Sequence, residues 1–267
     1  MTAYYHLGLL GFPLEHSRSP ELHHGFLRAC GLKGEYRLYE IPPEQPERLR
    51  ALLHDLRRGR LHGLNVTIPH KQRVLPWLDR LTPAAKAIGA ANTLWAEDGL
   101  LWGDNTDAPG FLADLQAQFG AALVPGRALV LGAGGAARAV VYALRHAGWQ
   151  VAVSARRFDQ AQTLCAAPEN ACRPVPWEAR GHTTPLPDLL VNATPLGMTP
   201  HEDASPWPPD APLPPWVYDL VYNPPATRLI RQARAAGARA ANGWGMLVAQ
   251  AALAFARWTG CRPPLPS

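Results

Sequence analysis

Lys71 is one of only three lysines in this chain of 267 residues, against 23 arginines. It ends the segment Asn65-Val66-Thr67-Ile68-Pro69-His70-Lys71. An arginine keeps its proton under ordinary conditions, whereas a lysine can transfer one. Lys71 is therefore a candidate for proton chemistry. The segment fits equally well a lysine that caps a turn between a strand and a helix, and on these residues alone both interpretations stay open.

A glycine-rich run, Gly132-Ala133-Gly134-Gly135-Ala136-Ala137, lies between a strand expected at 128–131 and a helix expected at about 136–147. The first glycine permits a tight turn, the second lets the backbone approach a pyrophosphate, and the small residue at 137 lets helix and strand pack closely. The helix amino-terminus then faces the phosphates. Small residues also occur in turns for packing alone, but the flanking elements favour a dinucleotide site.

The type of dinucleotide is indicated about 20 residues further on, after the next expected strand. NAD-binding sites carry an acidic residue there, for the ribose hydroxyls. This chain has Ala155-Arg156-Arg157 instead. Two guanidinium groups suit a 2′-phosphate, which they grip through paired hydrogen bonds. Although both arginines could be ordinary surface charges, the sequence predicts NADP as the cofactor.

Two hydroxyls, Ser17 and Ser19, precede a helix that is expected to begin with Ser19 as N-cap and Pro20 as its first residue. Such a helix start attracts anions, so a substrate carboxylate could rest there. A plain capping role for Ser19 is compatible with this. His16, His23 and His24 are nearby, but no cysteine or carboxylate joins them at ligand spacing, so we expect helix-surface histidines and no metal.

Composition describes a soluble globular protein, with 47% hydrophobic and 18% charged residues. The net charge of +5 is spread along the chain, which argues against nucleic acid as the main partner, although small anions would still be attracted. No apolar run approaches the roughly 18 residues that span a membrane. With no secretory signal at its start, and four cysteines too sparse for a disulfide scaffold, the chain is expected to be cytoplasmic with reduced thiols.

Strand and helix patterns alternate in both halves of the chain, which predicts α/β domains with mostly parallel sheets. Ten prolines between Pro195 and Pro225 predict a stiff, irregular loop. Strands are expected at 4–10, 36–39, 64–67, 128–131, 151–153, 189–191 and 217–220, with a hairpin at 93–102. Helices are expected at 19–31, 44–58, 136–147, 229–236 and 246–258, with one more beginning at Pro69 and another starting after Asp107.

Eight segments together resemble the signatures of shikimate dehydrogenases, in the family's order and over nearly the whole chain. Such a series is far more specific than any single motif. Besides the glycine-rich run at 132–137, they are Gly11 to Pro20, Asn65 to Lys71, Gly89-Ala90-Ala91-Asn92-Thr93, Gly103-Asp104-Asn105-Thr106-Asp107, Asn192 to Met198, Asp219 to Pro224 and Gly243 to Gln250.

The resemblance implies NADPH-dependent, reversible reduction of 3-dehydroshikimate to shikimate, on the route to chorismate and the aromatic amino acids. It implies two domains around a cleft: a substrate domain of residues 1–107, completed by a carboxyl-terminal helix within 243–267, and a Rossmann-type NADP domain of residues 108–242. It assigns catalysis to Lys71 and Asp107. It assigns substrate contacts to Ser17, Ser19, Asn65, Thr67, Asn92, Tyr222 and Gln250, and cofactor contacts to Gly132, Ala133, Gly134, Gly135, Ala136, Ala155, Arg156, Arg157, Thr194, Met198, Leu220 and Gly243.

The chemistry agrees with these side chains. A small ring with a carboxylate, hydroxyls and one ketone needs several uncharged donors and acceptors around it. The oxygen that gains negative charge on hydride transfer needs a proton, which Lys71 could deliver. Asp107 would orient the ammonium, although it could equally be only a helix cap.

Three other functions remain to be distinguished. One is an NAD-dependent quinate/shikimate dehydrogenase, which the arginine pair disfavours. The family usually shows Asn-Arg-Thr where this chain has Ala155-Arg156-Arg157, so only the central arginine is retained and the degree of preference for NADP stays open. Another is a methylene-tetrahydrofolate dehydrogenase, which the serine pair disfavours. The last is a catalytically silent ligand sensor, which intact Lys71 and Asp107 disfavour. The sequence is compatible with a monomer or a homodimer.

Overall fold

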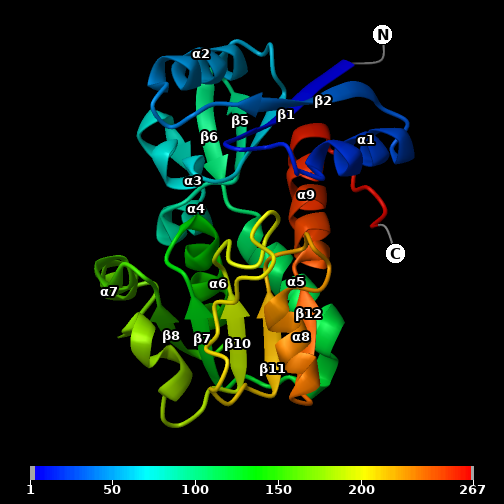
Figure 1. The fold of residues 1–267 in the computed structure, drawn as a ribbon. Coiled ribbons are helices and arrows are strands. Elements are labelled where there is room, and N and C mark those ends of the chain that lie inside the picture. Colours follow the sequence, from blue (N-terminus) through cyan, green and yellow to red (C-terminus); the bar gives the residue numbers. More distant parts are fainter. Residues whose placement is uncertain (1–3, 266–267) are drawn as a thin grey trace. The chain divides into compact units, whose positions relative to one another are not determined.

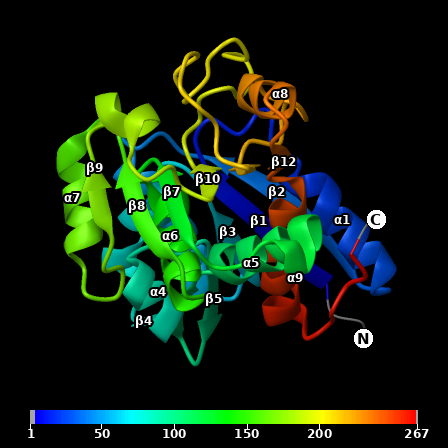
Figure 2. The same ribbon diagram turned by 90° about the horizontal axis from the view of Figure 1, so that it is seen from below.

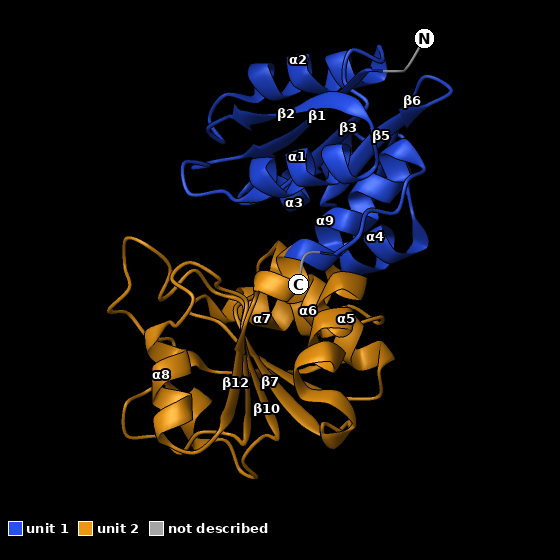
Figure 3. Cartoon of the chain, turned by 90° about the vertical axis from the view of Figure 1, so that its right-hand side faces the viewer, with its two compact units in different colours: residues 1–106, 248–267 blue, residues 107–247 orange. Residues whose placement is uncertain are grey.

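The computed structural model describes residues 4–265, and Figure 1 shows the order of the elements. The chain divides into two compact units, which Figure 3 colours separately. Unit 1 comprises Met1–Thr106 and Val248–Ser267, and unit 2 comprises Asp107–Leu247. The last helix, α9 (Trp244–Thr259), therefore begins in unit 2 and ends in unit 1.

Unit 1 contains a six-stranded sheet of order β2-β1-β3-β5-β6-β4. Only β5 runs against its neighbours, because β3 and β6 both pair with it in antiparallel register and the other pairings are parallel. The predicted mostly parallel sheet is thus present. Its strands are β1 (Tyr4–Gly11), β2 (Lys33–Glu40), β3 (Gly63–Val66), β4 (Arg80–Leu81), β5 (Thr93–Glu97) and β6 (Leu100–Asp104).

Helices of unit 1 cover both faces of this sheet. In Figure 3, α2 (Pro46–Arg57) lies on one side of the strands and α1 (Ser19–Ala29) on the other. The helical spacing of Leu49, Leu52, Leu53 and Leu56 places all four on the buried face of α2, where they share a core with residues of β3, β5 and β6. The short helices α3 (His70–Arg73) and α4 (Pro83–Ile88) and the 3₁₀ turn Leu75–Trp77 complete this region.

The carboxyl-terminal part of α9 packs directly on the unit 1 sheet. Trp258 lies against Gly63 of β3, where an added Cβ would come within 2.2 Å of the indole. The indole N–H of Trp258 also donates to the carbonyl of Leu94 in β5, at 3.0 Å. Gly63 is therefore required by close approach, and the end of the chain completes the core of unit 1.

Unit 2 contains six parallel strands in the order β12-β11-β10-β7-β8-β9. Counted from the first strand of the unit, this is the order 3-2-1-4-5-6 of a doubly wound dinucleotide-binding sheet, read from the β9 edge. The order reverses between β7 and β10. The strands are β7 (Arg127–Leu131), β8 (Gln150–Ser154), β9 (Arg173–Val175), β10 (Leu189–Asn192), β11 (Trp216–Asp219) and β12 (Arg239–Asn242).

Helices lie on both faces of this second sheet. Figure 2 shows α5 (Asp107–Phe119) and α6 (Gly135–His146) on one side of it and α8 (Arg228–Ala235) on the other. Phe111 of α5 packs edge-on against Tyr218 of β11, with ring centroids 5.2 Å apart. The remaining helical segments are α7 (Phe158–Ala166) and the 3₁₀ turns Gly120–Ala122 and Trp177–His182.

Several predictions about local structure are confirmed and others are wrong. The hairpin forms with Asp98 and Gly99 at its tip, both with positive φ, and the proline-rich stretch 193–215 contains neither helix nor strand. By contrast, Ser19 is not the N-cap of α1: Arg18 takes that position and Ser19 lies in the first turn. His23 is not a surface histidine, because α1 turns it inward and buries it completely.

The cysteines also differ from expectation. Cys30, just after α1, pairs with Cys261, just after α9, and Cys165 pairs with Cys172. The prediction of reduced thiols is therefore wrong for this structure. Spacing along the chain could not reveal the first pair, since its members are 231 residues apart and meet only because α9 returns to unit 1.

Removal of the long-range disulfide is expected to cost stability. Cys30→Ser should lower the free energy of unfolding by about 2–4 kcal/mol, because the disulfide restricts the unfolded chain. Cys172→Ser is the control and should have a smaller effect, since that disulfide spans only 7 residues. Urea unfolding without reductant measures both. Titration of four free thiols in the native, unreduced protein would contradict the pairing.

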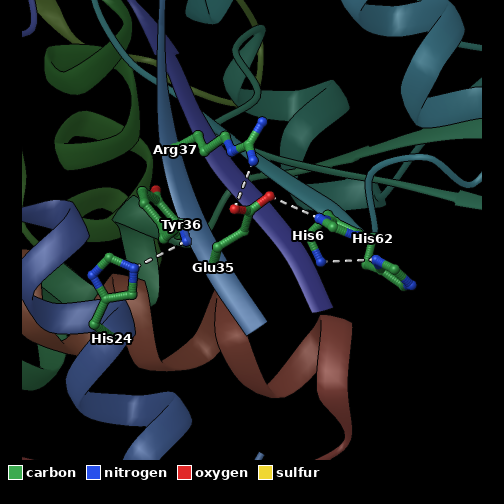
Figure 4. A network of polar contacts seen from close by, with 6 residues as sticks. All are labelled: His6, His24, Glu35, Tyr36, Arg37 and His62. Atoms are coloured by element: carbon green, nitrogen blue, oxygen red, sulfur yellow. Dashed lines mark hydrogen bonds and ion pairs between the residues drawn. The ribbon is translucent and has the colours of Figure 1, made fainter. Parts of the chain in front are cut away.

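A polar network at the amino ends of β1 and β2 accounts for several other histidines (Figure 4). His6 Nδ1 lies 2.8 Å from Glu35 Oε1, and the His6 backbone N–H donates to His62 Nδ1 at 3.0 Å. The hydrogen bond from His6 holds the pKa of Glu35 below its ordinary value. His24 Nε2 accepts from the Tyr36 backbone N–H at 3.2 Å. The network joins neighbouring elements at the strand ends opposite to those that carry the signature segments.

Candidate active site

A cluster of buried, uncharged polar side chains lies at one end of the unit 1 sheet. We call it the Asn92 cluster. Asn92 Nδ2 donates to Thr106 Oγ1 at 2.9 Å and to Gln250 Oε1 at 3.1 Å, and Asn92 Oδ1 accepts from the Thr106 backbone N–H at 2.8 Å. Asn65 Nδ2 donates to the Asn92 carbonyl at 3.2 Å. The cluster thus brings together Asn65, Asn92, Thr93, Thr106 and Gln250, of which sequence analysis had selected three.

Aromatic and imidazole rings lie beside this cluster. Tyr36 Oη donates to Asn65 Oδ1 at 2.8 Å, and burial raises the Tyr36 pKa well above its ordinary value, so the phenol keeps the proton that it donates. His23 stacks on Tyr36 with ring centroids 4.1 Å apart. Burial lowers the pKa of His23 to about 3, so this imidazole stays neutral. On the side of Tyr36 and His23, the cluster is therefore bordered by neutral groups.

The two candidate catalytic residues are linked through the backbone to residues of, or next to, the Asn92 cluster. Lys71 lies in α3 and is partly exposed, and its carbonyl accepts from the Ala91 N–H at 2.8 Å. Asp107 is 3% exposed, begins α5 and follows Thr106 in the chain. Lys71 is thus joined by a backbone hydrogen bond to Ala91, the residue before Asn92. Asp107 follows Thr106, which is hydrogen-bonded to Asn92.

The serine segment and the Thr67 segment lie side by side, beyond the carboxyl ends of β1 and β3. The Phe12 N–H donates to the Ile68 carbonyl at 2.9 Å. A Cβ on Gly11 would come within 2.4 Å of Thr67 Cγ2, so glycine is the residue that fits at position 11 beside Thr67. Ser17 Oγ accepts from the Ser19 N–H at 3.3 Å, which brings the two serines together at the start of α1.

The glycine-rich run forms the predicted turn between β7 and α6. Gly132 has φ +110°, a backbone conformation that favours glycine, and an added Cβ would lie 3.0 Å from the Ala193 carbonyl oxygen. Gly134 is the N-cap of α6 and is exposed. Backbone N–H groups at a helix amino-terminus next to a glycine-rich turn form a fitting site for a dinucleotide phosphate.

This geometry makes Gly132 sensitive to substitution. Gly132→Ala should weaken dinucleotide binding by roughly tenfold or more, since the strain of a positive φ costs on the order of 1–3 kcal/mol and the turn must shift away from Ala193. Gly148→Ala, at the far end of α6 with φ +88° and no atom closer than 3.8 Å, is the control for strain alone. Equal Kd values for the two variants, by fluorescence titration with NADPH, would contradict this account.

Arg156 and Arg157 follow β8 and are exposed, while Ala155 is buried. Within residues 4–265, neither guanidinium has an ion pair or hydrogen bond, so both are available to an anion. Among the other candidates, Thr194 is held by Asn192, Met198 is 42% exposed, and the Tyr222 ring lies 6.2 Å from that of Trp244. Gly243 approaches Leu220 so closely that an added Cβ would lie 2.2 Å from its carbonyl oxygen.

Comparison with known proteins decides the family. A family model described as "Shikimate dehydrogenase substrate binding domain" matches residues 9–94. A second, described as "Shikimate 5'-dehydrogenase C-terminal domain", matches residues 243–266. A relative named Shikimate dehydrogenase (NADP(+)), from Salinibacter ruber, is 45% identical over 94% of this chain and 90% of its own length. The chain belongs to the shikimate dehydrogenase family.

Solved structures of the family have the same fold. Shikimate 5-dehydrogenase from Thermus thermophilus in complex with NADP(H) and shikimate is 42% identical, with a TM-score of 0.85 over 97% of this chain and 95% of that one. Quinate dehydrogenase from Corynebacterium glutamicum in complex with NAD is 32% identical, with a TM-score of 0.85 over 98% and 95%. The predicted family, fold class and enzyme class are confirmed, and the relatives favour NADP-dependent shikimate dehydrogenase over the alternatives.

Two further findings concern metal sites and membrane-spanning helices. Among residues 4–265, no group of three or more histidine, cysteine, aspartate or glutamate side chains is arranged to hold a metal ion. No helix in that part of the chain is long and apolar enough to cross a membrane.

Sequence reasoning missed several polar residues near the candidate site. Thr106 and Asn192 lie inside segments quoted for the family resemblance but were not selected, and Asp219 begins another such segment. Thr227 lies outside all of them. A carboxylate or amide directly at the end of a buried strand was the available signal, since such a group must find partners in the fold.

Proposed function

We propose that this shikimate dehydrogenase catalyses the reversible, NADPH-dependent reduction of 3-dehydroshikimate to shikimate, on the route to chorismate and the aromatic amino acids. The observation that supports this most is the Asn92 cluster. It supplies buried, uncharged donors and acceptors of the kind that a polyhydroxylated ring requires. Lys71 and Asp107 adjoin its members in the backbone. Its uncharged state matches a substrate whose only charge is one carboxylate.

In the proposed reduction, the ketone carbon gains a hydride, and the electron pair of the C=O bond moves onto oxygen. Lys71 stabilises that oxygen and donates a proton from its ammonium, which completes the alcohol. In the reverse direction, the neutral amine accepts the hydroxyl proton as the hydride leaves. Asp107 orients the Lys71 ammonium and accepts a hydrogen bond from a substrate hydroxyl.

Substrate orientation falls to uncharged groups in this proposal. Ser17 and Ser19, which meet at the start of α1, donate to the substrate carboxylate. Thr67 lies beside the serine segment and contacts a ring hydroxyl. The other proposed substrate contacts are Asn65, Asn92, Tyr222 and Gln250.

Unit 2 binds the cofactor in this proposal, and the residues present fit NADP. The backbone of 132–136 holds the diphosphate at the start of α6, and the exposed Arg156 and Arg157 hold the 2′-phosphate. When bound, NADPH supplies the hydride. Ala155 would contact the adenosine, and the segments with Thr194, Met198, Leu220 and Gly243 would hold the nicotinamide end.

A spectrophotometric assay tests the function directly. The purified protein is incubated with each pair of shikimate or quinate with NADP or NAD, and formation of the reduced cofactor is followed. Shikimate with NADP should give the highest kcat/KM. A higher kcat/KM for quinate with NAD would reject this proposal in favour of the quinate alternative, and no turnover with any pair would leave the ligand sensor.

We also propose a cytoplasmic location, as expected for an enzyme of central biosynthesis. The two disulfides count against this, since cytoplasmic thiols are usually kept reduced. Cell fractionation tests the location independently of the cysteines: the protein should appear with cytoplasmic marker enzymes, and its recovery in another fraction would contradict the proposal.

A further inference from the structure

A buried carboxylate that the proposed mechanism does not use lies at the end of β11. Asp219 is 0% exposed. It accepts hydrogen bonds from Asn192 Nδ2 at 2.8 Å, from the Val221 N–H at 3.0 Å and from Thr227 Oγ1 at 2.6 Å. No arginine, lysine or histidine in the described part of the chain forms an ion pair with it. Three neutral donors therefore hold a fully buried negative charge.

Each of the side-chain donors fixes a further segment. Asn192 Oδ1 accepts from the Thr194 N–H at 3.0 Å and from Thr194 Oγ1 at 2.7 Å, so it shapes the loop that leads to Met198. Thr227 Oγ1 accepts from the Ile230 N–H at 3.2 Å, which caps α8. A single carboxylate thus connects the loop after β10, the turn after β11 and the start of α8.

The position of this network in the sheet gives it a function. β10, β11 and β12 form the second mononucleotide half of a sheet of this order, and the ligand lies outside the carboxyl ends of the strands at the point where the order reverses. Asn192 and Asp219 end β10 and β11 at that edge. Ala193, next to Asn192, is the residue that Gly132 approaches. The network therefore supports the nicotinamide half of the dinucleotide site, away from the arginine pair after β8.

We propose that Asp219 is a positioning residue for the nicotinamide half of the cofactor: through Asn192, Val221 and Thr227 its carboxylate holds the segments of Thr194 to Met198 and Leu220 to Tyr222 in their binding conformation. The inference rests on the proposed function. It distinguishes two halves of one cofactor site, with Arg156 and Arg157 serving the adenosine phosphate and the Asp219 network serving the nicotinamide.

Burial raises the pKa of Asp219 to about 6, above its ordinary value of 3.8. The folded chain thus binds this proton more tightly than the unfolded chain does. The contribution of Asp219 to the free energy of unfolding is most favourable at low pH and falls as the pH rises from about 4 to about 6. At neutral pH the ionised carboxylate is kept at a cost to stability, which is typical of a group retained for function.

The charged and titratable groups on neighbouring elements leave this titration to Asp219 itself. Burial, and then the charge of Asp114 in α5, raise the pKa of Tyr218 on the same strand well above its ordinary value. The side chains of Arg228 and Arg231 on α8 donate instead to the carbonyls of Asp203 and Ala226. Asn242 of β12, in register with Asp219, carries no charge.

The test is Asp219→Asn, with binding of NADP compared with binding of adenosine 2′,5′-bisphosphate, which lacks the nicotinamide half. Isothermal calorimetry at pH 7.5 should show NADP binding weakened by about tenfold, as expected for the loss of charge-assisted hydrogen bonds, with the bisphosphate unchanged. The melting temperature should stay the same or rise, because the costly buried charge is gone. A purely structural role predicts the opposite, a lower melting temperature with both ligands weakened equally, and that result would overturn the inference.

Thr227 provides a matched pair if Asp219→Asn fails to fold. Thr227→Ser keeps the hydroxyl that donates to Asp219 and should bind NADP as the wild type does. Thr227→Val keeps the shape of the side chain without the hydroxyl. It should weaken the binding of NADP but not the binding of the bisphosphate. Equal NADP affinity of the two Thr227 variants would contradict the proposed role of the network.

A pH series separates this inference from the proposed function. The Kd for NADP, divided by that for the bisphosphate, is measured for the wild type and for Asp219→Asn from pH 7.5 to 5.5. As the pH falls, the wild-type ratio should rise relative to the ratio for Asp219→Asn, which corrects for the titration of the bisphosphate's own 5′-phosphate. The same pH dependence of the two ratios rejects the role of Asp219 and leaves the dehydrogenase intact. Failure of the wild type to bind either ligand rejects the proposed function itself.

Discussion

Lys71→Ala is expected to lower kcat by about 10²–10⁴-fold, the usual contribution of a general acid, while shikimate still binds with nearly the wild-type Kd. The reason is the division of labour in the site. In the proposed site, substrate binding is spread over the uncharged side chains of the Asn92 cluster and the serine segment, whereas the proton would come from the single ammonium of Lys71. Single-turnover reduction of 3-dehydroshikimate by NADPH measures the first effect. Calorimetric titration with shikimate measures the second.

Two variants act as controls for Lys71. Lys71→Arg keeps the positive charge but not a proton that can be transferred, so it should stay close to Lys71→Ala in kcat. Lys86→Ala removes an exposed lysine from α4 and should leave kcat unchanged. Recovery of most of the activity by Lys71→Arg would mean that charge stabilisation, and not proton transfer, is the function of Lys71. Near-normal turnover of Lys71→Ala would remove it from the mechanism.

Much of the fold could be read from the sequence because its local signals agree with its tertiary structure. The leucine spacing of 44–58, the hairpin around Asp98 and Gly99, and the glycine run after a buried strand each predict an element that forms. The elements that were missed have weaker patterns. β9 and β12 are edge strands of three and four residues, with few buried side chains to show a period. α7 begins in a polar run directly after Arg157, and the arginines before it were interpreted as part of a cofactor site and not as the start of a helix.

Features that depend on distant parts of the chain could not be predicted. The burial of His23 requires Tyr36, Phe255 and Trp258 to surround it, and two of these come from the last helix. The pairing of Cys30 with Cys261 depends on the same return of α9 to unit 1. Residues of the candidate site were found mainly through the family resemblance, since an isolated asparagine or glutamine has no spacing that reveals a partner such as that between Asn92 and Gln250.

The Asp219 network shows that a sequence motif does not reveal the hydrogen-bond partners of its residues. Asp219 was visible as the first residue of a family segment, but its partners are Asn192 on the neighbouring strand and Thr227 eight residues later. Only parallel pairing of β10 with β11 brings the first pair together, because Asn192 and Asp219 are in register. The register of a sheet follows from the packing of its whole core, which short sequence patterns do not encode.

Arg156→Ala is expected to weaken NADPH binding by about 10–100-fold and NADH binding by less than twofold. The guanidinium of Arg156 is exposed and unpaired among the described residues, so its charge is available to the 2′-phosphate that distinguishes the two cofactors. Hydrogen bonds between charged partners are each worth about 1.5–3 kcal/mol, which sets the expected range. Arg157→Ala is the matched control: Arg157 is the N-cap of α7, whereas Arg156 holds the place of the one arginine that the family usually keeps. The larger loss should therefore fall on Arg156. Fluorescence titration of both variants with NADPH and NADH decides the point, and equal weakening of the two cofactors by Arg156→Ala would show that its contribution is to the fold of the loop and not to the recognition of the phosphate.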